Sequence, residues 1–315
     1  MRIGILESKD FSQKAINSLN KIGDVVFLDG LLDKKSLKDI DILFVRLLNF
    51  IGEDHLKAAK NLKIICSPTT GLNHIDLKAC KKRKISIISI KGDFKFLSTI
   101  RATPEHTFGL VLSLLRNYKD AFLKDSNWNR EQFKGFELYK NKVGIVGLGR
   151  VGKILVKYFK AFNTKVFYFD IDESVKDING AIRCVNIEDL LKKSNIVVLA
   201  ASYSELNYQF FDKKYIKLLK NKYFINTSRG ELIDEEYLIN RLENKFFKGV
   251  ALDVIQNEQS KNNLQRLLKL VESNNLIITP HISGATYSSM ERTEEFVVLK
   301  LLKHLKANER DNNRQ

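Results

Sequence analysis

Short runs rich in β-branched and aromatic residues recur along this chain, and stretches with helical periodicity separate most of them. The runs cover residues 2–6, 24–28, 41–45, 62–66, 84–88, 142–146, 165–169, 195–199, 222–226, 249–252 and 276–279. Strands that are apolar throughout and alternate with helices are typical of parallel sheets with helices on both faces. This pattern predicts an α/β protein built from doubly wound parallel sheets.

Two helical segments divide the chain. With 315 residues, the chain is longer than one ordinary domain. Residues 103–118 are apolar around most of the helical circumference, which predicts a helix buried in an interface. We expect Thr103 to be its N-cap and Pro104 its first helical residue. A last helical segment, at about 284–307, has no strand after it, so we expect one domain from 1–101 with 284–315 and a second from 102–283.

The net charge, the cysteine spacing and the lack of a long apolar run bear on the classes of partner and the cellular location that can be expected. The formal net charge is +16, but the lysines are scattered and mixed with acidic residues, so a solvated basic surface is favoured over a nucleic-acid footprint. The three cysteines are far apart and form no C-x-x-C pair, which argues against a disulfide framework or a metal site. The chain starts on a predicted strand and has no apolar run approaching about 18 residues. We therefore expect a cytoplasmic protein without a membrane partner.

A glycine-rich turn stands between a strand and a helix. In "VGIVGLGRVG", Gly147, Gly149 and Gly152 have G-x-G-x-x-G spacing, directly after the strand 142–146 and at the start of an amphipathic helix. In this context the glycines allow a tight turn, a close approach of the backbone to a pyrophosphate and close packing of helix on strand. The helix N-terminus, with Arg150 and Val151, presents its N–H groups to the phosphates.

An acidic residue follows at the end of the next strand. Asp170 lies 18 residues after Gly152, where a carboxylate accepts hydrogen bonds from a ribose 2′-hydroxyl and repels a 2′-phosphate. Asp172 adds to this repulsion, and no arginine follows closely. The sequence therefore predicts NAD, rather than NADP, as the cofactor.

Three further groups follow predicted strands in the second domain. Arg229 comes after the strand 222–226, Asp253 and Glu258 come after the strand 249–252, and His281 comes after the last strand. In an open parallel sheet, ligands bind beyond the carboxyl ends of the strands, so these side chains are expected to converge near the nicotinamide.

Together these groups suit hydride transfer to a carbonyl. Histidine is the side chain best suited to exchange the proton near neutral pH. Glu258 would favour the protonated form of His281 and fix its orientation. Arg229 can bind a substrate carboxylate with its planar fork. Singly, each has an ordinary structural alternative: a salt bridge, a loop cap or a solvated carboxylate.

The chain resembles the D-isomer-specific 2-hydroxyacid dehydrogenases, a family that includes phosphoglycerate dehydrogenase. The motifs "GLGRVG", "NTSRGELID", "LDV…E" and "TPHISGAT" match its signatures in order. The resemblance implies a Rossmann NAD domain inserted into a flavodoxin-like substrate domain, a homodimer, and an active site in the cleft between the domains. It assigns the catalytic set to Arg229, Glu258 and His281. It implies an NAD-dependent oxidoreductase that interconverts a D-2-hydroxy acid and a 2-oxo acid.

The resemblance also implies further ligand contacts. "TTGLNHIDL" looks like the substrate-carboxylate loop, in which the backbone amides around Thr70, Gly71 and Leu72 bind the anion. Thr103, Thr227 and Asp253 are implied as cofactor contacts, with Asp253 facing the nicotinamide carboxamide.

Some positions depart from the family pattern or bear on the substrate. Arg46 stands where phosphoglycerate dehydrogenases carry a substrate-facing arginine, but Ser67 replaces a second one. Gln259 replaces the usual proline, which predicts a less rigid loop around Glu258. No counterpart of the C-terminal regulatory domain of many phosphoglycerate dehydrogenases follows, so feedback through such a domain is not expected.

The resemblance includes two other functions. An NAD-sensing, corepressor-like binding module of the same fold is the alternative, because the corepressors of the family keep the same three catalytic residues. Formate dehydrogenase chemistry is disfavoured, because that branch uses glutamine where Glu258 stands.

Overall fold

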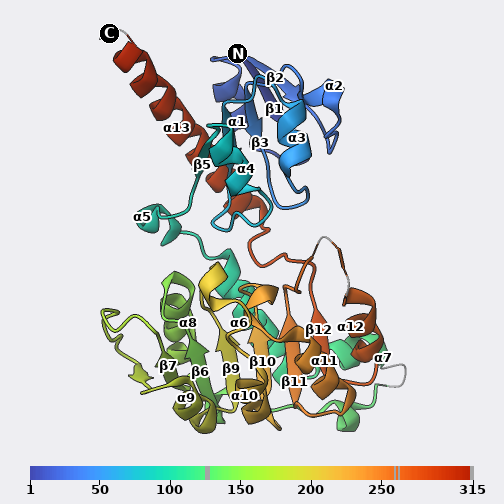
Figure 1. Cartoon of the computed structure of the whole chain (residues 1–315). Coiled ribbons are helices and arrows are strands. Elements are labelled where there is room, and N and C mark those ends of the chain that lie inside the picture. Colours follow the sequence, from blue (N-terminus) through green and yellow to red (C-terminus); the bar gives the residue numbers. More distant parts are fainter. Residues whose placement is uncertain (125–127, 259, 262, 313–315) are drawn as a thin grey trace. The chain divides into compact units, whose positions relative to one another are not determined.

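The computed structural model describes residues 1–315 except 125–127, 259, 262 and 313–315. It consists of two compact units (Figure 1). Unit 1 comprises residues 1–100 and 285–315, and unit 2 comprises residues 101–284. These limits lie one residue from the domain limits expected from the sequence.

Unit 1 is built on a five-stranded parallel sheet with the order β2-β1-β3-β4-β5. This is the flavodoxin-like order. Its strands are β1 (Arg2–Ile5), β2 (Asp24–Phe27), β3 (Ile42–Phe44), β4 (Ile64–Ser67) and β5 (Ser86–Ser89). Its helices are α1 (Gln13–Leu19), α2 (Lys34–Leu37), α3 (Glu53–Ala58), α4 (Leu77–Lys82), α5 (Phe94–Leu97) and α13 (Tyr287–Asn312). One hydrophobic core packs α1 and α13 on the sheet, and another packs α2, α3 and α4 on its other face.

Unit 2 is built on a seven-stranded parallel sheet with the order β12-β11-β10-β9-β6-β7-β8. Counted within the unit, this is the Rossmann order extended by one strand. Its strands are β6 (Lys142–Val146), β7 (Lys165–Phe169), β8 (Ala181–Arg183), β9 (Ile196–Leu199), β10 (Tyr223–Asn226), β11 (Gly249–Leu252) and β12 (Leu276–Ile278). Its helices are α6 (Ala102–Leu115), α7 (Tyr118–Lys124), α8 (Arg150–Ala161), α9 (Ile187–Lys193), α10 (Lys213–Ile216), α11 (Glu235–Glu243) and α12 (Leu264–Val271). Helices α6 and α8 pack on one face, and α9 to α12 pack on the other.

The structure confirms the predicted α/β class with two parallel sheets, and every predicted run contains a strand. Two details were wrong or missed. Helix α6 begins at Ala102 with Arg101 as its N-cap, so Thr103 does not cap it. Pro104 still lies in the first turn, where backbone N–H groups have no intrahelical acceptor. Strand β8 was missed, because three residues at a sheet edge, none of them buried, leave no apolar run.

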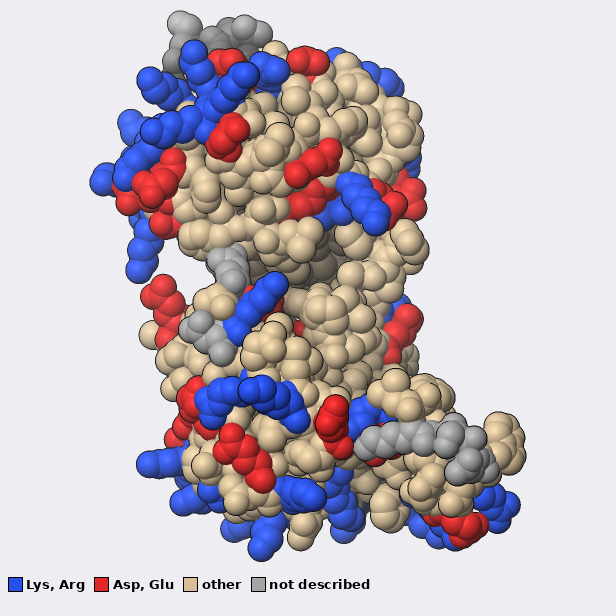
Figure 2. Space-filling view, turned by 90° about the vertical axis from the view of Figure 1, so that its right-hand side faces the viewer, with Lys and Arg blue, Asp and Glu red and all other residues tan. Residues whose placement is uncertain are grey.

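The surface charges are mixed. Figure 2 shows Lys and Arg side chains spread over the face that it draws, with Asp and Glu side chains between them. Among the described residues, no helix combines the length and the apolar composition needed to span a membrane.

Candidate active site

The turn that carries Arg229 is shaped by a buried asparagine. Asn226, the last residue of β10, is fully buried; its Nδ2 donates to the carbonyl of Arg229 (2.9 Å), and its Oδ1 accepts from the N–H of Ser228 (2.9 Å). The Ser228 hydroxyl donates to the carbonyl of Leu199, at the end of β9 (2.9 Å). These bonds fix the backbone of Arg229 at the carboxyl end of the sheet.

Gly230 lets this turn lie against the chain that leads to Glu258. A Cβ atom at Gly230 would lie 2.0 Å from the carbonyl carbon of Ile255 and 2.3 Å from the nitrogen of Gln256. No side chain fits at such distances. The glycine therefore holds the turn of Arg229 and the segment after β11 in direct backbone contact.

Asp253 organises the loop that carries His281. Its carboxylate is fully buried and accepts hydrogen bonds from the Thr279 hydroxyl (2.6 Å), from the N–H of Ile282 (2.9 Å) and from the N–H of Ser283 (2.9 Å). Its backbone carbonyl accepts from the N–H of His281 (2.8 Å). Burial alone would raise the pKa of Asp253, but these bonds and His106 outweigh it and lower the pKa. His281 is held with a left-handed backbone (φ 52°), which histidine adopts more readily than most residues.

His281 and Glu258 are in direct contact. The Nδ1 of His281 lies 2.7 Å from Oε2 of Glu258, and both side chains are partly exposed. A carboxylate on Nδ1 leaves Nε2 as the nitrogen that can face a ligand. Burial lowers the pKa of Arg229, and the carboxylates of Glu258, Glu231 and Asp253 oppose this shift. The carboxylate of Glu258 therefore acts on both the histidine and the arginine. The structure brings together the three groups predicted at the ends of β10, β11 and β12.

The glycine-rich turn after β6 has the geometry of a phosphate cradle. Gly149 is the N-cap of α8, so the amides of Arg150 and Val151 lie in its first turn. A Cβ atom at Gly152 would lie 2.3 Å from the carbonyl oxygen of Gly147, so only glycine allows the helix this close to the turn. Asp170 accepts from the N–H of Leu148 (2.6 Å) and ties the end of β7 to the turn. These residues fit a bound dinucleotide.

Helix α6 contributes a second histidine to this region. His106 Nε2 lies 3.2 Å from Oγ1 of Thr279 and 3.4 Å from Oδ1 of Asp253. The hydroxyl of the next residue, Thr107, bonds to the hydroxyl of Thr227 (2.7 Å) and donates to the carbonyl of Thr103 (2.7 Å). Helix α6 therefore contacts Thr227, two residues before Arg229, and Thr279, two residues before His281.

Unit 1 presents a polar loop after β4. Ser67 is fully buried, and its hydroxyl bonds to His74 Nε2 (3.0 Å) and to the Thr69 hydroxyl (2.9 Å). Thr69 in turn donates to the carbonyl of Gly71 (2.7 Å). Within the described residues, no backbone or side-chain acceptor receives the N–H groups of residues 70–72. These three amides, predicted to bind an anion, are therefore available to one.

Arg46 lies at the end of the neighbouring strand, and its guanidinium is engaged. It forms an ion pair with Glu294 of α13 and donates from Nη1 to the carbonyl of Lys9 (3.0 Å). It also lies over the ring of Phe11, 5.3 Å from its centroid.

Sequence reasoning gave no role to Asn226, His106 or Glu235. Asn226 lies in the motif "NTSRGELID" and His106 lies in the helical segment 103–118, and this placement is the signal that could have found them. Glu235 is almost fully buried and accepts from the N–H of Gln256 (2.7 Å) and from Nδ2 of Asn263 (2.9 Å), so it holds both ends of the loop around Glu258. Gln259, predicted to loosen this loop, lies outside the described residues.

Comparisons with known proteins agree on one family. Residues 108–283 match the model of the D-isomer specific 2-hydroxyacid dehydrogenase NAD-binding domain. The D-3-phosphoglycerate dehydrogenase of Methanocaldococcus jannaschii is 30% identical over 312 residues, 96% of this chain but only 58% of that protein. The glyoxylate reductase of Thermofilum pendens is 30% identical over 281 residues, 86% of this chain and 80% of that protein. The D-lactate dehydrogenase of Aquifex aeolicus, solved with NAD and lactic acid, is 25% identical with a TM-score of 0.82 and covers 98% of this chain and 96% of its own.

Proposed function

Because the chain belongs to the D-isomer specific 2-hydroxyacid dehydrogenase family of NAD-dependent oxidoreductases, we propose that it interconverts a D-2-hydroxy acid and a 2-oxo acid with His281 as the acid and base. The observation that supports this role most strongly is the contact between His281 and Glu258, at 2.7 Å, beside the half-buried charge of Arg229.

The proton is handled by His281. Its Nδ1 faces Glu258, so Nε2 is the atom that gives a proton to the substrate oxygen during reduction and takes it back during oxidation. Bound NADH supplies the hydride that reduces the 2-oxo carbon. Glu258 fixes the orientation of the imidazole through its contact with Nδ1.

The substrate carboxylate is bound by Arg229. A guanidinium presents two parallel N–H donors to a carboxylate, and its charge is stronger where water is excluded. We assign the amides of Thr70, Gly71 and Leu72 as further donors to the same anion, because their N–H groups have no acceptor among the described residues. Arg46 takes part in substrate selection rather than in carboxylate binding, because its guanidinium already forms an ion pair.

The cofactor is held by the cradle of unit 2. The amides of the turn Gly147–Gly152, including Arg150 and Val151, bind the pyrophosphate, and Asp170 binds the ribose. Thr103 and Thr227 line the nicotinamide side. Asp253 was predicted to face the carboxamide; its buried carboxylate gives it the additional role of fixing the loop of His281.

The test is a steady-state assay that follows NADH absorbance with glyoxylate, hydroxypyruvate, pyruvate and phosphohydroxypyruvate. His281→Ala is expected to lower turnover by roughly 100-fold or more, because positioned acid–base groups contribute about that much. The dissociation constant of NADH, measured by fluorescence, should stay within about threefold of wild type. The control is His304→Ala, a histidine on α13 outside the proposed site. Unchanged turnover in His281→Ala would remove histidine from the mechanism.

The corepressor alternative gains no support from the comparisons, because the relatives named above are dehydrogenases and a reductase. The homodimer and the cytoplasmic location remain predictions.

A further inference from the structure

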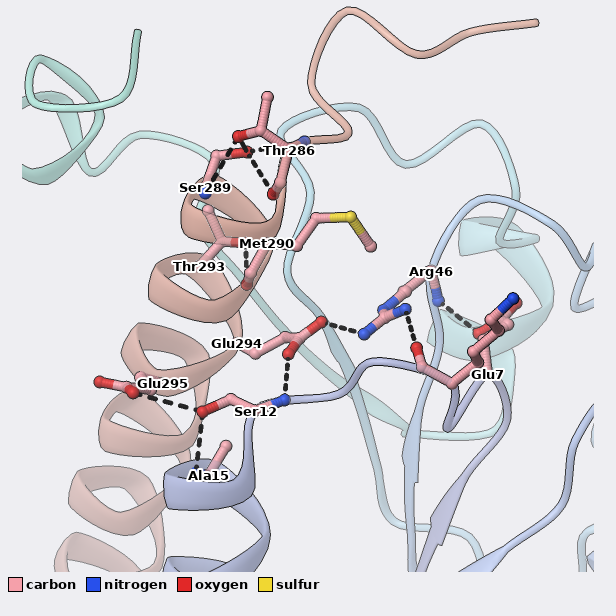
Figure 3. A network of polar contacts seen from close by, with 11 residues as sticks. Glu7, Ser12, Ala15, Arg46, Thr286, Ser289, Met290, Thr293, Glu294 and Glu295 are labelled. Carbon is pink, nitrogen blue, oxygen red and sulfur yellow. Dashed lines mark hydrogen bonds and ion pairs between the residues drawn. The ribbon is translucent and has the colours of Figure 1, made fainter. Parts of the chain in front are cut away.

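The carboxyl edge of the unit 1 sheet carries a buried cluster of charges, made of Glu7, Arg46 and Glu294 (Figure 3). Glu7 follows β1 and is almost fully buried; its Oε2 accepts from the N–H of Arg46 (2.8 Å), and its Oε1 accepts from Nδ2 of Asn49 (2.9 Å). Arg46 follows β3, next to the strand whose end leads into the loop 69–72. The cluster therefore borders the proposed anion site.

Glu294 is built to hold Arg46. Its side chain is fully buried on α13; one oxygen meets the guanidinium, and the other accepts from the N–H of Ser12 (2.7 Å). The two side chains point toward each other in Figure 3. Burial raises the pKa of Glu294, and the bonds from Ser12 and Arg46 oppose that shift. Because a guanidinium cannot lose its charge, the ion pair offsets the charges of the two groups, while the buried Nε of Arg46 has no hydrogen-bond partner among the described residues.

The cluster of Glu7, Arg46 and Glu294 has a negative formal charge. Two carboxylates and one guanidinium give it a formal charge of −1. The neighbouring strand offers no second cation, because β4 ends with Ser67, whose hydroxyl is bonded to His74 and Thr69. A substrate with a second anionic group at this edge would meet a guanidinium that is already paired with Glu294.

We propose that Glu294 is a specificity-determining residue, which neutralises Arg46 and restricts the enzyme to 2-oxo acids whose only anion is the 2-carboxylate. The proposal rests on the proposed function. The name of the relative D-3-phosphoglycerate dehydrogenase would suggest a phosphorylated substrate. The proposal instead places hydroxypyruvate, pyruvate or glyoxylate within the substrate class.

The first test compares two substrates that differ by one phosphate. Wild-type kcat/KM is measured with hydroxypyruvate and with phosphohydroxypyruvate at the same ionic strength. We expect hydroxypyruvate to be favoured by about tenfold or more, because the guanidinium that could pair with the phosphate is already paired with Glu294. Equal values, or a preference for the phosphorylated acid, would overturn the proposal. Turnover with neither of these acids, nor with glyoxylate or pyruvate, would instead overturn the proposed function.

The second test removes the charge that holds Arg46. Glu294→Gln keeps the volume and one oxygen for the N–H of Ser12, but it no longer neutralises Arg46. We expect the ratio of kcat/KM for phosphohydroxypyruvate over hydroxypyruvate to rise by roughly tenfold. The matched control is Glu295→Gln, which removes the same charge from the next residue, a partner of Lys14 and of the Ser12 hydroxyl. An equal rise in the control, or no rise in a Glu294→Gln protein whose circular dichroism matches wild type, refutes the role of Glu294. If that variant does not fold, the wild-type comparison still decides the substrate class.

Discussion

Replacing Gly230 with alanine should separate Glu258 from His281, the proposed catalytic pair, without changing either residue. The added Cβ would lie 2.0 and 2.2 Å from the carbonyl carbon and oxygen of Ile255 and 2.3 Å from the nitrogen of Gln256. Ordinary contacts between such atoms are about 3.5–4.0 Å, so the backbone must retreat by roughly 1.2–2 Å. This segment leads directly to Glu258, whose carboxylate lies 2.7 Å from the imidazole of His281.

Two magnitudes follow from that displacement. A misplacement of about 1 Å at a catalytic group can cost on the order of 100-fold in rate, so we expect kcat to fall by about that factor. Overpacking of this kind costs about 1–3 kcal/mol, which for a domain of this size corresponds to a Tm lower by roughly 2–12 °C. NADH binding should be nearly unchanged, because the phosphate cradle follows a different strand.

The assay combines steady-state kinetics on the preferred 2-oxo acid with a thermal melt. Gly109→Ala is the matched control: it makes the same chemical change in helix α6, where an added Cβ meets nothing within 4 Å. This control should keep kcat and gain about 0.5–1 kcal/mol, because alanine is the better helix former. If Gly230→Ala keeps kcat within about threefold of wild type, the contact between the two segments does not position Glu258, and the reasoning fails.

Two further variants test the groups on either side of this contact. Arg229→Lys keeps the charge but loses the planar fork, so kcat/KM should fall by on the order of 100-fold, with a higher KM; unchanged kinetics would show that a point charge suffices. Asp253→Asn should lower the free energy of unfolding at pH 7 by about 1.5–3 kcal/mol, because three donors lose a charged acceptor. Since the folded pKa of Asp253 is lowered from 3.8, this stabilisation is present above about pH 4 and is lost as the pH falls through the folded pKa. Urea unfolding of both proteins at pH 7, 4 and 3 should therefore show the difference shrinking at the lowest pH, and a difference that does not depend on pH would argue against the ionised carboxylate.

The fold could be predicted because it depends on a local signal. Strands buried on both faces leave continuous apolar runs in the sequence, and each such run contains a strand. The signal fails where burial is low, as in β8, and where a helix extends beyond its apparent cap, as at Ala102. Arg229, Glu258 and His281 could be found because parallel strands place their carboxyl ends along one edge, and β10, β11 and β12 are neighbours in the sheet.

Contacts made across the fold could not be found in this way. His106 acts through Asp253 and Thr279, which are more than a hundred residues away in the chain, and nothing in its own segment points to them. The partner of Arg46 is 248 residues away, on the last helix. Glu235 has the sequence context of an ordinary acidic residue in the first turn of a helix, and only the packing of the loop over it makes it a buried acceptor.

The two arginines at strand ends show why the local sequence does not determine the function of a charged residue. Both follow buried strands and both are largely removed from water. Arg46 has a dedicated partner, because Glu294 meets its guanidinium directly. Arg229 has none within ion-pair distance among the described residues: its Nη1 donates to the carbonyl of Ser228 (2.6 Å), and the carboxylates of Glu258, Glu231 and Asp253 act on it from farther away. A buried cation that is stabilised only at a distance gains most from an anion that arrives with the substrate, whereas a cation with a built-in partner gains little. In our proposals, therefore, the same residue type binds the substrate at one strand end, whereas at the other it is neutralised by Glu294 and does not bind a second anion.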